Sequence, residues 1–197
     1  PCDDNDPCTA NDVVTNCTCA GTPSGIPTPT ASNAGPFCVG DPLVLNGTAG
    51  GGFIFSWTGP SGPVSANLNA NLGPATPSMA GVYTFQSSNG TCTGSATTTV
   101  VVNTPPSLSF STTPESCPGQ NDGAIDLTVN GGVGTPTYNW SSNIPCAFDP
   151  QCPLPLLCLP GPFTCGANNS VQDLSGLPAA QYTVTVNMGG CSVSQTI

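Results

Sequence analysis

Hydrophobic and polar residues alternate along several short stretches of the chain. In AAQYTVTVNMGGCSVSQTI, residues 179–197, Tyr182, Val184 and Val186 alternate with Thr and Asn, and a Gly-Gly pair follows. A period of two residues predicts a strand with one buried face, and Gly-Gly predicts a turn into a second strand beginning at Cys191. Similar runs, separated by Gly, Pro and Asn turns, recur along the chain, which is therefore predicted to be all-β.

Composition supports this fold class. The 24 Gly and 23 Pro disfavour long helices, because Gly is entropically costly in a helix and Pro removes a hydrogen-bond donor. Low charge, two Trp and twelve Cys argue against a disordered chain. No apolar run approaches the 18 residues that a membrane-spanning helix requires, and no initiator Met or signal peptide is present. We expect a mature or excised piece of an exported protein.

Two sets of four residues repeat in the same order, Cys, Trp, Tyr and Cys. In both sets the Tyr precedes the second Cys by nine residues, and the sets are Cys38, Trp57, Tyr83 and Cys92, then Cys117, Trp140, Tyr182 and Cys191. The interval from Trp to Tyr is 26 residues in the first set and 42 in the second. The excess of 16 coincides with a separate cluster, Cys146, Cys152, Cys158 and Cys165. Such self-similarity indicates tandem modules.

The repeat predicts a domain organisation. We expect a Cys- and Asp-rich head at 1–22, a Pro-, Ser- and Gly-rich linker at 23–35, and two domains at 36–103 and 106–197, the second with a Cys-rich insertion at 144–169. About seven short strands per domain, with turn residues between them, favour two immunoglobulin-like β-sandwiches.

The aromatic residues of the repeat fit such sandwiches. Equivalent positions in two modules favour core packing of Trp57 and Trp140 over exposed platforms for sugars. The match to the antibody pattern is loose, because that pattern places a Cys two residues after the Tyr, where this chain has Phe85 and Val184.

Twelve cysteines indicate an oxidising compartment, so we expect an extracellular protein. The repeat suggests two pairs, Cys38 with Cys92 and Cys117 with Cys191, each stabilising the fold by about 4 kcal/mol in the chain-entropy model. Two groups of four remain, each with three possible connectivities: Cys2, Cys8, Cys17 and Cys19, and Cys146, Cys152, Cys158 and Cys165. Disulfides are favoured over zinc, because the head lacks paired Cys-x₂-Cys spacing.

The charge balance excludes several functions. The net charge is −10, with no Lys, Arg or His. Binding of nucleic acid or of an anionic membrane depends on cationic side chains, so both are excluded. A Ser or Cys nucleophile would lack its basic partner, and the acids are scattered, so we expect no enzyme.

The head concentrates carboxylates that could bind a hard cation such as Ca²⁺. Candidate ligands are Asp3, Asp4, Asp6 and Asp12. The spacing is not that of an EF-hand, and a solvated acidic turn tied by disulfides is the alternative.

The second domain resembles the SprB-like repeat of very large surface adhesins that Bacteroidetes export through the type IX system. Two stretches carry the resemblance, CPGQNDGAIDLTVNGGVGTPTYNW and VQDLSGLPAAQYTVTVNMGGCSVSQTI, while the insertion at 144–169 departs from it. The head PCDDNDPCTANDVVTNCTCAG is similar to Cys-Asp spacers of such proteins, and the first domain resembles their Ig-like modules. The resemblance implies an extracellular, cell-surface structural or adhesive protein and no enzyme.

We therefore expect a structural subunit of a bacterial surface fibre or adhesin stalk. Its partners would be further copies assembling head to tail, or neighbouring modules of a longer chain. The alternative is a glycan- or surface-binding module that uses the insertion at 144–169. Five N-x-S/T triplets make a glycoprotein plausible without assigning a site.

The final strand bears on assembly. Ten residues, TGSATTTVVV, continue after Cys92, whereas six, SVSQTI, follow Cys191. The last strand is thus about four residues shorter than its repeat partner. Either the chain was cut from a longer one or this strand lies at a subunit junction, and an open strand edge favours assembly.

Overall fold

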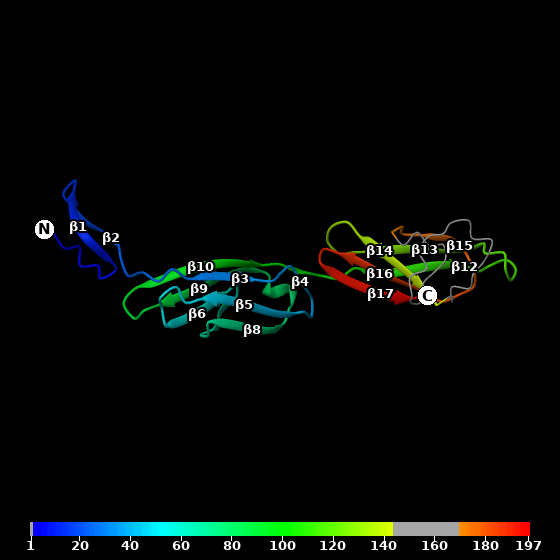
Figure 1. Ribbon diagram of the computed structural model, residues 1–197, viewed down its shortest axis with the longest axis horizontal. Coiled ribbons are helices and arrows are strands. Elements are labelled where there is room, and N and C mark those ends of the chain that lie inside the picture. The colour runs from blue at the N-terminus through cyan, green and yellow to red at the C-terminus, as the bar shows by residue number, and fades with distance from the viewer. Residues whose placement is uncertain (1, 144–169) are drawn as a thin grey trace, which may run out of the picture. The chain divides into compact units, whose positions relative to one another are not determined.

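The computed structural model describes residues 2–143 and 170–197 of the chain. Two units are distinguished, Pro1–Val102 and Asn103–Ile197 (Figure 1). The predicted Cys-rich insertion at 144–169, with its four cysteines, lies outside the described residues.

A two-stranded hairpin begins the first unit. Strands β1 (Thr9–Thr15) and β2 (Thr18–Pro23) pair antiparallel. Asn16 and Cys17 join them, both with positive φ, as a two-residue turn between twisted strands requires.

The rest of the first unit is a sandwich of two sheets. One sheet has the order β3-β5-β8, formed by β3 (Thr30–Asn33), β5 (Pro42–Thr48) and β8 (Asn69–Pro74). The other has the order β10-β9-β6-β7, formed by β6 (Ile54–Gly59), β7 (Gly62–Ser65), β9 (Gly81–Ser88) and β10 (Thr93–Val100). A short pair, β4 (Phe37–Cys38) and β11 (Val102–Asn103), extends the sandwich, and a 3₁₀ turn, η1 (Pro77–Met79), precedes β9.

The second unit repeats this architecture. One sheet has the order β12-β13-β15, formed by β12 (Ser107–Thr113), β13 (Gly123–Asn130) and β15 (Leu174–Leu177). The other has the order β14-β16-β17, formed by β14 (Thr137–Ser142), β16 (Tyr182–Met188) and β17 (Cys191–Thr196). The predicted all-β fold with two tandem Ig-like sandwiches is confirmed.

One predicted boundary is wrong. Residues 23–35 were expected to be a linker, but β3 lies within them and pairs with β5 from Thr30↔Thr48 to Asn33↔Leu45. The sequence did not predict this strand, because it is only four residues long and the residues before it are rich in Pro. The sandwich therefore begins at Thr30.

Each sandwich closes around one tryptophan. Trp57 is fully buried and Trp140 is 3% exposed, so the predicted core role of both is confirmed. Each indole Nε1–H donates to a backbone carbonyl that precedes a strand of the facing sheet. Trp57 donates to Leu68, before β8, at 3.1 Å, and Trp140 donates to Val171, before β15, at 3.0 Å. The large apolar ring is thereby buried without leaving its N–H unpaired.

Phe85 and Val184, where an antibody domain has cysteine, are fully buried in the two cores. The Phe85 ring packs against Trp57 with centroids 4.7 Å apart. Aromatic and aliphatic packing thus takes the place of an inter-sheet disulfide at this position.

The repeated tyrosines form equivalent corners. Tyr83 Oη donates to the Met79 carbonyl and Tyr182 Oη to the Pro178 carbonyl, both at 3.0 Å and four residues upstream. Burial raises the pKa of both phenols, and for Tyr182 the negative charge of Glu115 adds to this effect. Such a bond from a Tyr to the preceding backbone is the tyrosine corner of Ig-like sandwiches.

Replacing Tyr182 by Phe tests the corner. We expect Tyr182→Phe to lower the free energy of unfolding by about 1 to 2 kcal/mol, because the Pro178 carbonyl loses its partner. Tyr138→Phe is the matched control, because that hydroxyl makes an exposed hydrogen bond to Gln172. Urea unfolding followed by circular dichroism measures both, and equal losses in the two variants would contradict a special role for the corner.

Candidate functional site

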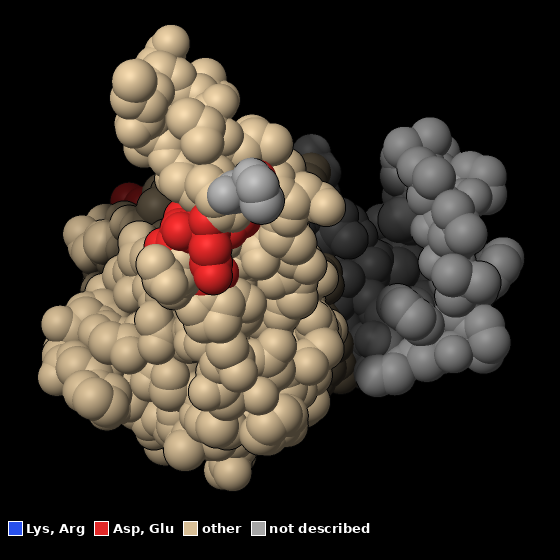
Figure 2. All heavy atoms as spheres, turned by 90° about the vertical axis from the view of Figure 1, so that its left-hand side faces the viewer, with Lys and Arg blue, Asp and Glu red and all other residues tan. Residues whose placement is uncertain are grey.

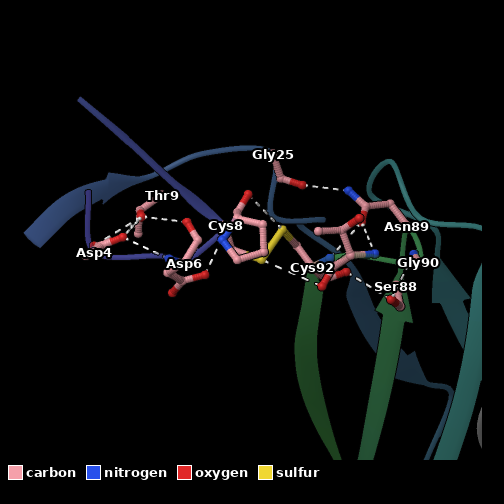
Figure 3. Close-up of a disulfide and its surroundings, with 11 residues drawn as sticks. Asp4, Asp6, Cys8, Thr9, Gly25, Ser88, Asn89, Gly90 and Cys92 are labelled. Atoms are coloured by element: carbon pink, nitrogen blue, oxygen red, sulfur yellow. Dashed lines mark hydrogen bonds between the residues drawn. A yellow bond between two sulfur atoms is a disulfide. The ribbon is translucent and has the colours of Figure 1, made fainter. Parts of the chain in front are cut away.

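A disulfide attaches the head hairpin to the first sandwich. Cys8 and Cys92 are bonded across a sequence separation of 84 residues (Figure 3). Beside this bond, Asn89 Nδ2 donates to the Gly25 carbonyl at 2.8 Å. The Thr28 N–H donates to the Gly50 carbonyl at 2.9 Å. Head and sandwich are therefore joined by covalent and backbone contacts.

Gly94 on β10 lets the connecting segment lie close to the sandwich. A Cβ at this position would come within 1.8 Å of the Pro27 carbonyl oxygen. No larger residue fits without displacing the backbone of the segment. Pro27 itself is buried, so this part of the predicted linker lies against β10.

The predicted bond between Cys38 and Cys92 is wrong. Cys38 belongs to β4, which pairs with β11 just after the end of β10, whereas Cys92 precedes the start of β10. The eight residues of β10 separate the two sites by roughly 26 Å, at about 3.3 Å per residue. A disulfide requires Cα atoms within about 7 Å. Cys38 is disulfide-bonded, but not to Cys92.

The predicted bond between Cys117 and Cys191 is wrong for the same reason. Cys117 follows the end of β12 and carries a free, exposed thiol. The Cys191 Sγ lies 3.7 Å from the carbonyl oxygen of Asn103, before the start of β12. Seven residues of strand separate these ends, so the two sulfur atoms cannot meet. Cys191 is disulfide-bonded to a different partner.

The head cysteines do not form a closed group of four. Cys2 bonds Cys19, while Cys8 bonds outside the head. Cys17 has a free, exposed thiol and lies in the hairpin turn. The prediction that all four head cysteines are disulfide-bonded is therefore wrong for Cys17.

Three carboxylates of the head converge. Ligand oxygens of Asp3, Asp4 and Asp12 lie within 4.8 Å of one another, and acidic atoms form a patch near the N-terminal end in Figure 2. Asp6, the fourth predicted ligand, is not in this group. Its Oδ1 instead accepts the Cys8 N–H at 2.9 Å. The structure thus brings together three of the four predicted metal ligands.

Backbone amides hold the acidic segment in place. Asp3 Oδ1 accepts the Asn5 N–H and Asp4 Oδ1 accepts the Asp6 N–H, as in successive Asx turns. Asp4 Oδ2 accepts the Gly21 N–H of β2 at 2.9 Å. The amides of Asp6 and Gly21 hold the pKa of the Asp4 carboxyl below its ordinary value.

Asp12 has one carboxylate oxygen that lacks a partner. Its Oδ2 accepts the Asp4 N–H at 3.0 Å, but the buried Oδ1 has no hydrogen-bond partner. Gly21 makes room for it, because a Cβ there would lie 2.1 Å from this oxygen. A buried carboxylate oxygen without a hydrogen-bond partner, beside two further carboxylates, is an arrangement that could hold a hard cation.

Sequence reasoning found the acids but missed the bond between Cys8 and Cys92. The length of β10 excludes a bond between Cys92 and Cys38, because the two residues lie at opposite ends of this strand. It does not indicate Cys8 as the partner. Asp122 stabilises the turn between β12 and β13, because it accepts the N–H and Oγ–H of Ser116 at 2.8 and 2.6 Å.

The fold and the disulfide-bonded head define a class of protein, a tandem of Ig-like sandwiches that begins with a hairpin bonded to the first sandwich. Within it, residues 109–143 match the SprB repeat. No curated protein matches the chain. Among the described residues, no helix is long and apolar enough to cross a membrane.

A solved structure made of Ig domains has a similar fold. The N-terminal eight Ig domains of Down Syndrome Cell Adhesion Molecule align with TM-score 0.50 and 18% identity, over 86% of this chain and 24% of that one. A mouse coronavirus receptor-binding domain complexed with its murine receptor gives TM-score 0.49 and 13% identity, over 86% and 98%. This chain spans about a quarter of the first protein's length. At these identities the likeness concerns the fold.

Together these findings describe two Ig-like sandwiches, the second of which contains a match to the SprB repeat. The SprB repeat, the Ig-like sandwiches and the disulfides fit an extracellular or surface protein.

Removing the bond between Cys8 and Cys92 tests its role in holding the head. We expect the Cys8→Ala, Cys92→Ala double variant to lose about 4 kcal/mol of stability in the first unit, because an 84-residue loop is no longer closed in the unfolded chain. Hydrogen exchange of residues 81–100 measures this loss. Cleavage of residues 23–29 by a non-specific protease reports release of the head.

Cys2→Ala with Cys19→Ala is the matched control, because that bond spans 17 residues within the head. We expect this double variant to leave the hydrogen exchange of residues 81–100 unchanged. Equal effects of the two double variants on that exchange would refute the role of the longer bond.

Proposed function

We propose that the chain is a structural subunit of a bacterial surface fibre or adhesin stalk that assembles head to tail. The observation that carries this proposal is the bond between Cys8 and Cys92, which makes the head a covalent part of the first sandwich. A head that was only tethered would move independently. The disulfide restrains the movement of the head relative to the sandwich, and a stiff stalk requires such restraint.

The charge of the chain supports a structural role. With no Lys or Arg, the chain contains no site for a trypsin-like protease. With no His or Lys, it has no side-chain base for nucleophilic catalysis of the common kinds. Its stability comes from buried apolar cores, backbone ladders and disulfides, which persist outside cells.

Electron microscopy of the purified chain tests assembly. At high protein concentration we expect fibres with an axial repeat close to one subunit length, because a heterologous head-to-tail contact propagates without closing. Light scattering at increasing concentration is the parallel measurement. A monodisperse monomer throughout would rule out self-assembly, although it would not affect the fold assignment.

We further propose that the head binds Ca²⁺ through Asp3, Asp4 and Asp12. The unpaired Oδ1 of Asp12 and the spacing of the three carboxylates support this site. Ca²⁺ takes six to eight oxygen ligands, so backbone carbonyls and waters would complete its shell. A bound cation would also relieve repulsion in a head that contains no positive side chain.

Calorimetric titration with Ca²⁺ checks this site. We expect a dissociation constant of about 0.1 to 1 mM, as in extracellular modules. Asp12→Asn should weaken binding at least about tenfold, because the amide keeps the acceptor for the Asp4 N–H but removes the charge. Asp126→Asn, an exposed acid on β13, is the control. No heat of binding at several millimolar Ca²⁺ would exclude the site.

A further inference from the structure

The chain contains three Asn-Gly dipeptides, and the structure places them in different environments. They begin at Asn46, Asn89 and Asn130. An Asn followed by Gly can lose its side-chain amide group, because the next backbone nitrogen attacks the side-chain carbonyl carbon and glycine has no Cβ to obstruct the approach. The attack requires a backbone nitrogen that no hydrogen bond holds and a side chain that can rotate towards it. These two requirements distinguish the three sites.

Asn46 is held in the middle of a sheet. It lies on β5, where it pairs with Ser32 of β3 on one side and with Asn69 of β8 on the other. The Gly47 N–H donates to Asn69 Oδ1 at 3.2 Å, and Gly47 is buried. A Cβ at Gly47 would lie 2.9 Å from the Phe85 ring, so this part of the backbone is closely packed. The reaction at Asn46 therefore requires both ladders of β5 to open.

Asn89 is held by its own side chain in the turn between β9 and β10. Its Oδ1 accepts two backbone N–H groups of the turn, at 3.0 and 2.8 Å, and its Nδ2 donates to the Gly25 carbonyl at 2.8 Å (Figure 3). The Gly90 N–H donates to Ser88 Oγ at 3.1 Å. Both the attacking nitrogen and the side-chain amide are therefore occupied by hydrogen bonds.

Asn130 lacks these restraints. It is exposed and is the last residue of β13, where it pairs with Ser107, the first residue of β12. Its Nδ2 donates to Ser109 Oγ at 3.5 Å, which is longer than a typical hydrogen bond. Gly131 is also exposed, and its N–H has no hydrogen-bond partner among the described residues. Only the terminal pair of this ladder must open to release the reacting groups.

The residues after Asn130 allow the rotation that the reaction needs. Gly131 and Gly132 have φ angles of +72° and +75°. The space beside Gly131 is open, because a Cβ built there would meet no atom within 4 Å. Rotation of the peptide between Asn130 and Gly131 therefore meets little steric resistance.

We propose that Asn130 is a site of spontaneous deamidation in the folded protein, and that the fold protects Asn46 and Asn89. The Gly131 nitrogen loses its proton to solvent and attacks the Asn130 Cγ. A bond from this nitrogen to Cγ forms, the bond from Cγ to Nδ2 breaks, and ammonia leaves. Water then opens the five-membered imide at either carbonyl and leaves aspartate or isoaspartate. This inference does not depend on the proposed assembly.

The modification changes both charge and backbone at the end of β13. Either product adds one negative charge to a chain whose net charge is already −10. Isoaspartate also inserts its Cβ methylene into the main chain, next to the pair with Ser107. We expect this product to open the end of the β12–β13 ladder, because an insertion in one strand disturbs its pairing register. A long-lived chain would thus acquire a chemical mark of its age.

Mass spectrometry of chymotryptic peptides tests the site, because the chain has no Lys or Arg for trypsin. After incubation of the folded chain at mildly alkaline pH, we expect the peptide with Asn130 to gain about 1 Da, as OH replaces NH₂. Asn46 and Asn89 should react at least about tenfold more slowly, because their reaction requires prior local opening. The same chain, reduced and unfolded in urea, should react at similar rates at all three sites.

Two variants connect the reaction to the added charge. Asn130→Gln should abolish the acidic form that accumulates in ion-exchange chromatography, because the longer side chain must close a less favourable six-membered ring. Asn46→Gln is the matched control and should leave that form unchanged. Equal rates at the three sites of the folded chain would overturn the proposal. It would also be overturned if Asn130 did not react in the folded chain while it reacted in the unfolded one.

Discussion

Burial of one tryptophan between two sheets is the interaction on which each unit depends. Trp57 and Trp140 lie in the two cores, and each indole N–H is paired with a carbonyl of the segment leading to the opposite sheet. This pairing sets the spacing of the sheets around the ring. The corner tyrosines then fix the entry of β9 and β16, and with them the register of the last strands.

A chain without cationic side chains must satisfy its carboxylates by other means. Backbone amides and a hydroxyl group do this here. Asp4 accepts hydrogen bonds from the N–H groups of Asp6 and Gly21, and Asp122 accepts them from the N–H and Oγ–H of Ser116. These hydrogen bonds lower the pKa of both carboxyls. They also shape the acidic head, whose remaining unpaired oxygen on Asp12 is its chemically distinctive feature.

The disulfide pairing of the cysteines could not be predicted from the sequence. Equivalence within a repeat correctly aligned Cys92 with Cys191, but it wrongly paired each with the first Cys of its own repeat. A strand of seven or eight residues separates the paired positions by more than 20 Å, so the partners come from elsewhere. For Cys92 the partner is Cys8 in the head, a long-range bond with no local signal in the sequence.

The sequence by itself determined the local elements and the core. Alternation of apolar and polar residues located the strands, and the repeated Trp and Tyr marked the two sandwiches, because both signals depend on neighbours along the chain. Tertiary structure alone decided which carboxylates converge, which cysteines bond, and that Thr30–Asn33 is a strand. Each of these depends on which residues, far apart in the sequence, meet in space. No local sequence pattern determines those contacts.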